Sequence, residues 1–141
     1  MVVEPYEVID HTADIGIRVA AENLEELFIR AAEAMFDVMV ASKPNLTANI
    51  NVPIEISAER QDELFVKWLQ ELLYVFDTRH LVLSSFYIDK LSETMLSGTA
   101  KGMKFDELRH ELKRQIKAVT YHKLALEKKD DAWHATVIFD I

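Results

Sequence analysis

The residues of this chain that could do chemistry include two carboxylates at its end. An apolar run over 137–139 is followed by Asp140 and Ile141, which predicts a strand that continues to the last residue. Such a strand would hold the terminal carboxylate beside the Asp140 side chain, and two anionic groups so close repel each other unless a cation or a proton neutralises them. Carboxylate and carbonyl oxygens are the ligands that hard cations such as Ca²⁺ prefer.

A further carboxylate, Asp14, ends a polar turn over residues 10–14 near the start of the chain. If this turn lies beside the end of the chain, Asp14 completes an anionic oxygen cluster with Asp140 and the last residue. The structural alternative is that Asp14 caps its turn and Asp140 is solvated, and spacing alone favours this alternative. His11, in the same turn, is expected to bond to the backbone, because hard cations do not seek imidazole.

Signatures of the common enzyme classes are absent from the sequence. The chain has no cysteine, which excludes disulfides, thiolate metal sites and a cysteine nucleophile. Its three glycines, Gly16, Gly98 and Gly102, form neither a phosphate-binding loop nor a dinucleotide fingerprint. No serine stands in a nucleophile-elbow pattern. The sequence therefore favours a protein that is not itself an enzyme.

The charge is unevenly distributed along the chain. Its formal net charge is −8, which argues against strong direct binding to nucleic acid, because that binding needs an excess of Lys and Arg. Residues 101–129 nevertheless carry nine basic side chains against four acidic ones. The ordinary interpretation of this stretch is a solvated face. The functional interpretation is an acidic body that docks onto a basic partner and has one basic patch of its own.

Two amphipathic helices are predicted to support these residues. The first covers about 23–40, with Asn23 as N-cap and Glu26 three positions on, and Pro44 prevents its continuation. The second covers about 59–77 and has a stripe of large apolar side chains at helical spacing.

Alternating or β-rich segments predict about seven strands. They lie at 6–20, as two strands around the polar turn, and at 46–56, 86–90, 93–101, 118–126 and 133–139. Pro53 predicts an edge strand or a bulge, and Gly98 and Gly102 indicate bends or close backbone approaches. The segment 106–114 permits a short helix. The prediction is one α+β domain over residues 1–141, with mixed or antiparallel sheets and a C-terminal β-hairpin.

Length and composition agree with one globular domain. The chain has 141 residues, of which 50% are hydrophobic and 28% charged, so a disordered chain is not expected. No apolar run approaches the roughly 20 residues of a membrane-spanning helix, and the first residues lack the basic region of a secretory signal. The expected location is cytoplasmic, with no membrane association.

Five blocks of the sequence together resemble the archease family. They are HTADIG at 11–16, LQELLY at 69–74, RH at 109–110, KAVTYH at 117–122 and VIFDI at 137–141. Each block is weak alone, but the five follow the order of the family and cover essentially the whole chain.

This resemblance implies a non-catalytic activator of the RtcB-type tRNA-splicing ligase, which joins a 3′-phosphate or cyclic phosphate to a 5′-hydroxyl. Archease-like proteins are understood to promote guanylylation of the ligase, allow multiple turnover and broaden its nucleotide use. The resemblance also implies a divalent metal site, commonly assigned to Ca²⁺, with Mg²⁺ or Mn²⁺ as alternatives. Its ligands would be Asp14, Asp140 and the main-chain or terminal oxygen of Ile141. The tRNA would be an indirect partner.

Several residues are candidates for contacts to the ligase or to phosphate, each with a structural role as the alternative: His11, Arg109, His110, Lys117 and His122. Three rival functions remain open. One is a chaperone or adaptor that serves other DNA- or RNA-processing proteins. Another is a metal-dependent hydrolase that uses Asp14 and Asp140 to activate water, although no general base is recognisable beside them. The third is direct RNA binding through 101–129, which the overall charge disfavours.

Overall fold

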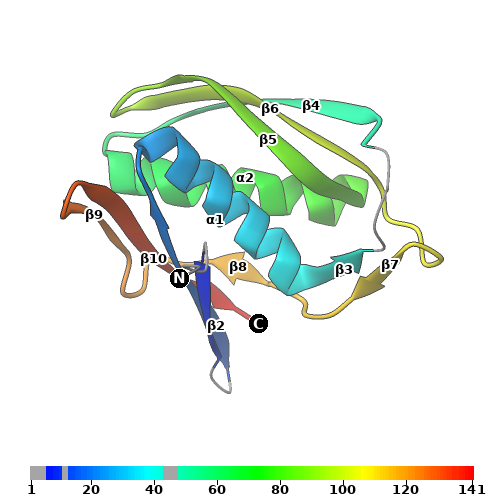
Figure 1. Cartoon of the computed structure of the whole chain (residues 1–141). Helices are drawn as coiled ribbons and strands as arrows, with labels where there is room; N and C mark the ends of the chain where they lie inside the picture. Colours follow the sequence, from blue (N-terminus) through cyan, green and yellow to red (C-terminus); the bar gives the residue numbers. More distant parts are fainter. Residues whose placement is uncertain (1–5, 11–12, 43–47) are drawn as a thin grey trace.

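In the computed structural model, which describes residues 6–10, 13–42 and 48–141, two helices lie between two antiparallel sheets (Figure 1). The helices are α1 (Leu24–Met39) and α2 (Gln61–Arg79). The strands are β1 (Tyr6–Asp10), β2 (Asp14–Ala21), β3 (Val40–Ser42), β4 (Ile50–Ser57), β5 (Leu81–Leu91), β6 (Met95–Lys104), β7 (His110–Leu112), β8 (Ala118–Val119), β9 (Ala125–Lys129) and β10 (Ala132–Asp140).

The larger sheet has the order β1-β2-β10-β8, and β9 also pairs with β10. The second sheet has the order β4-β6-β5, and β3 and β7 form a small ribbon of their own. Every pair is antiparallel. Because α1 contacts β2 and β10 on one side and β5 on the other, the core is shared between the two main sheets. This arrangement confirms the predicted α+β class.

Helix α1 confirms the prediction for 23–40. The Asn23 side chain accepts a hydrogen bond from the Glu26 amide at 2.8 Å, as its spacing predicted. Small side chains on several sides of the helix are fully buried, among them Ala31, Ala32 and Ala34. The helix keeps one exposed acidic face, with Glu25 and Glu33 on it, while its buried side chains contact both main sheets. The small alanines let both sheets approach it closely.

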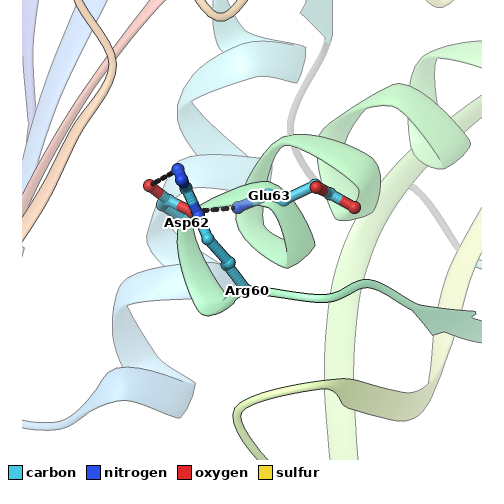
Figure 2. Close-up of polar contacts among 3 residues, drawn as sticks. All are labelled: Arg60, Asp62 and Glu63. Carbon is cyan, nitrogen blue, oxygen red and sulfur yellow. Dashed lines mark hydrogen bonds and ion pairs between the residues drawn. The ribbon is translucent and has the colours of Figure 1, made fainter.

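Helix α2 begins and ends two residues later than the predicted range of 59–77, and an ion pair lies at its start. Arg60 precedes the first turn and donates to both carboxylate oxygens of Asp62, at 3.0 and 2.6 Å (Figure 2). The same carboxylate accepts from the Glu63 amide at 2.7 Å, which satisfies one free N–H of the first turn. The hydrogen bond from Arg60 lowers the pKa of Asp62. At the other end His80 takes a left-handed conformation and stops the helix. No helix in the described ranges has the length and apolar character needed to cross a bilayer.

The strand predictions are confirmed in their main lines. The two strands around the polar turn are β1 and β2, and the strand with Pro53 is β4, which lies at the edge of its sheet as predicted. The predicted strand at 86–90 is the second half of β5, and the predicted strand at 93–101 overlaps the first part of β6. The two strands form a longer hairpin than predicted.

Two strand predictions are wrong, and one open segment is now assigned. The expected number of strands, about seven, is too low, since the described residues contain ten. The segment 106–114, for which the sequence only permitted a short helix, holds the strand β7, which pairs with β3. The continuous strand at 118–126 is broken after Val119: the Thr120 hydroxyl donates to the Ile138 carbonyl at 2.8 Å, and Lys123 has a positive φ of 54°. The terminal hairpin is therefore formed by β9 and β10.

The glycines of β6 confirm the predicted close backbone approach. A Cβ on Gly102 would lie 2.1 Å from the Val82 carbonyl oxygen and 2.8 Å from the Leu83 Cα, at a bulge in β5. We expect Gly102→Ala to lower the free energy of unfolding by about 1–3 kcal/mol, because backbone atoms cannot move aside cheaply. Urea denaturation measures this loss, with Ser97→Ala on the same strand as control. Equal midpoints for Gly102→Ala and the wild type would contradict the close approach.

Candidate metal centre

The pairing of β2 with β10 brings Asp14 and Asp140 together. Their Cα atoms are direct partners at the last step of the ladder. Residues directly opposite in an antiparallel pair project to the same face, with Cβ atoms about 4.5–5.5 Å apart. The ladder is extended by the Ile141 amide, which donates to the Ala13 carbonyl at 3.4 Å. Ala13 and Asp14 thus lie beside Asp140 and Ile141, the proximity that the cluster hypothesis required.

One oxygen of Asp14 has no visible partner. Among the buried side-chain nitrogen and oxygen atoms of the described residues, Asp14 Oδ1 is the one without a hydrogen-bond partner. Leaving a buried acceptor unsatisfied costs about 1–3 kcal/mol, and more when it is charged. Asp140, opposite, is exposed. A cation between the two carboxylates would satisfy the buried oxygen and remove their mutual repulsion, so the donor chemistry fits a hard divalent ion.

Side chains alone do not complete such a site. The described residues contain no group of three or more His, Cys, Asp and Glu side chains that could hold a metal ion. A site at Asp14 and Asp140 would therefore need main-chain oxygens or water as well, which Ca²⁺ commonly uses. The Ile141 oxygen, next to Asp140, is the available main-chain candidate. His11 lies outside the described residues.

The end of β10 is held by the segment that contains β8, and this segment is in turn bonded to α2. The Lys117 amide donates to the Asp140 carbonyl at 2.7 Å, and the Thr120 amide donates to the Ile138 carbonyl at 3.0 Å. From α2, the Gln70 side chain donates to the Val119 carbonyl at 3.2 Å. These bonds give a structural role to residues of two of the sequence blocks, 69–74 and 117–122.

The candidates for partner contacts fall into two groups. Lys117 and His122 are exposed, with His122 in a turn rather than on the strand face expected for it. His110 is only 5% exposed, and its Nδ1 accepts from the Asp106 amide at 3.0 Å. Arg109 pairs with the Asp106 carboxylate at 2.8 Å. For His110 the surface interpretation is replaced by a structural one, because a buried ring cannot contact a partner directly.

The buried histidine stabilises the loop before β7. Its ring stacks on Phe105 with centroids 5.5 Å apart. Burial lowers the pKa of His110, and the nearby Asp106 carboxylate opposes that shift in part. Since Nδ1 accepts a hydrogen bond, the folded state requires the neutral ring.

Comparisons with known proteins agree with the five sequence blocks. The model of the Archease protein family (MTH1598/TM1083) matches residues 6–141. The chain belongs to the archease family. The archease of Pyrococcus furiosus is 39% identical over 140 residues, covering 96% of this chain and 98% of the relative. The archease of Methanosarcina barkeri is 36% identical, with 96% and 95% covered.

Two solved structures share the fold. The solution structure of Methanobacterium thermoautotrophicum protein 1598 superposes with a TM-score of 0.83 at 34% identity, covering 99% of this chain and 100% of that one. A Thermotoga maritima crystal structure, described as an archease and possible chaperone, gives a TM-score of 0.66 at 21% identity, with 94% of each chain covered. The second likeness concerns the archease fold alone.

The buried histidine makes the stability of this archease-family chain depend on pH. Because the pKa of His110 is lowered in the folded state, the unfolded chain takes up the proton more readily, and stability is lost as the pH falls below the ordinary value of 6.5. We expect His110→Asn, which keeps an acceptor but does not titrate, to lose less stability than the wild type between about pH 7.5 and about 5.5. Urea denaturation at each pH tests this, with the exposed His122→Asn as control. Parallel curves for wild type and His110→Asn would contradict it.

Proposed function

We propose that this chain is a non-catalytic activator of the RtcB-type tRNA-splicing ligase, which promotes guanylylation of the ligase, supports multiple turnover and broadens its nucleotide use. Family membership over residues 6–141 supports the proposal. The observation that carries it is the pairing of Asp14 with Asp140 around a buried carboxylate oxygen without a partner. The proposed role does not require this chain to catalyse a reaction.

In this proposal Asp14, Asp140 and the main-chain oxygen of Ile141 hold a divalent cation. Ca²⁺ is the first expectation, because it accepts carboxylates together with carbonyls and water, and Mg²⁺ and Mn²⁺ are alternatives. When bound, the ion would supply a fixed positive charge at the end of the β2–β10 ladder. The role of the chain is to hold the two carboxylates on one face at the end of a paired ladder.

The net negative charge of this chain favours a partner with a basic surface. The net charge of −8 would steer this chain toward a ligase surface that binds RNA, and exposed carboxylates such as Glu25, Glu33 and Asp37 follow one another along α1. The tRNA would then be an indirect partner, bound by the ligase. In this proposal the side chain of exposed Lys117, whose amide donates to the Asp140 carbonyl, contacts phosphate or ligase beside the ion.

Thermal unfolding tests the ion directly. Saturating Ca²⁺ should raise the Tm of the wild type above its value in chelator, and a ligand at 100 times its Kd adds about 2.7 kcal/mol. Asp14→Asn should lose this response. In chelator the same variant should be at least as stable as the wild type, because it removes a buried anionic oxygen without a partner. Asp89→Asn, at an exposed carboxylate of β5, is the control that keeps the response. A wild-type Tm that does not change with Ca²⁺ would contradict the site.

Ligation under multiple-turnover conditions tests the function. The cognate ligase should turn over many times with the wild-type chain and accumulate little guanylylated enzyme without it. Asp14→Asn should abolish the stimulation, while Asp89→Asn should retain it. Equal stimulation by Asp14→Asn would refute the role of the metal centre, and no stimulation by the wild type would refute the activator itself.

A chaperone or adaptor role is the second candidate, favoured by the description of the Thermotoga maritima relative as a possible chaperone. Affinity purification from cell extract distinguishes the two. A single dominant ligase partner supports the activator, and a broad set of DNA- or RNA-processing proteins supports the chaperone.

A further inference from the structure

An ion pair between distant parts of the chain lies beside the proposed metal centre. The Arg114 guanidinium is 2.6 Å from the Asp10 carboxylate, across 104 positions of sequence. Asp10 is the last residue of β1 and is paired with Ile15, the residue after Asp14. The ion pair therefore acts on the strand end next to the carboxylate that would bind the ion.

Arg114 belongs to a segment that is firmly attached to the core. The Lys113 and Arg114 amides donate to the Met39 carbonyl at the end of α1, at 2.7 and 3.4 Å. Ile116 is buried and only 2% exposed. The Lys117 amide, three residues after Arg114, donates to the Asp140 carbonyl at 2.7 Å. The segment that carries the guanidinium is thus the segment that positions Asp140.

The step between Asp14 and Asp140 is the last of its ladder, and strand ends open more readily than strand centres. The bond that extends it, from the Ile141 amide to the Ala13 carbonyl, is long at 3.4 Å. We propose that the Arg114–Asp10 pair is a latch that sets the position of Asp14 relative to Asp140 and the Ile141 oxygen. Both are positioning residues. This inference rests on the proposed metal centre.

Removal of the Arg114 guanidinium should change the Ca²⁺ affinity in opposite directions, depending on whether Arg114 acts through its charge or by positioning the strand end. If Arg114 acts only through its charge, its removal makes the surroundings more negative and strengthens cation binding. If Arg114 positions the strand end, its removal weakens cation binding in spite of that gain. The direction of the change in Ca²⁺ affinity therefore distinguishes the two.

The test compares Ca²⁺ affinities by calorimetry for the wild type, Arg114→Met, and the charge exchange Asp10→Arg with Arg114→Asp. Arg18→Met is the matched control, because Arg18 of β2 is also an ion-pair partner of a β1 carboxylate, Glu7 at 3.5 Å, but this pair lies away from the strand end that holds Asp10. We expect Arg114→Met to weaken Ca²⁺ binding about two- to fivefold, the range of a partly exposed ion pair. The exchange should recover most of the affinity, and Arg18→Met should not weaken binding.

A second measurement in chelator separates the latch from the metal. Hydrogen exchange of the Ile141 amide should be faster in Arg114→Met than in the wild type or Arg18→Met. Unchanged exchange, or Ca²⁺ binding by Arg114→Met as tight as or tighter than the wild type's, overturns the latch. Faster exchange in Arg114→Met, together with a wild type that binds no Ca²⁺, supports the latch and overturns the proposed metal centre.

Discussion

The candidate metal centre depends on the antiparallel register of β2 against β10. A shift by one residue would move every side chain of one strand to the other face of the sheet. The register is specified by the core, since Ile17 lies opposite Val137 and Ile15 opposite Phe139, all of them buried. The same alternation that buries these side chains places Asp14 and Asp140 together on the opposite face. The site is therefore a consequence of how the core packs.

The layers around this ladder make its register costly to change. Helix α1 packs on β2 and β10 from one side and on β5 from the other, so the larger sheet cannot slide without disturbing the second (Figure 1). The Trp68 side chain of α2 is fully buried and donates to the Phe28 carbonyl of α1 at 2.8 Å, which joins the two helices. Local anchors from β8 and from the segment before it then hold the end of β10. An acidic pair at a strand end is thus supported by the whole fold.

Much of this architecture follows from pattern in the sequence. The Asn23 cap and the apolar spacing specify α1, and Pro53 specifies an edge strand, because both depend on local chemistry. The short strand β7 was not predictable, since only its pairing with β3 makes it a strand. The break after Val119 was missed for a similar reason, because the Thr120 hydroxyl bonds to another strand rather than to its own neighbours. In the candidate site, the sequence indicated which carboxylates could bind a cation. It could not show that they lie close together, or that one oxygen of Asp14 has no partner, because both depend on tertiary structure.

A cation bound where β2 begins and β10 ends can be located by paramagnetic broadening with trace Mn²⁺. The effect falls steeply with distance and can be assigned residue by residue in the isotopically labelled protein. If the proposed site exists, the amides of Asp14, Asp140 and Ile141 broaden first, and excess Ca²⁺ reverses the effect. Broadening centred on the exposed carboxylates of α1, or spread evenly over the acidic surface, would contradict it.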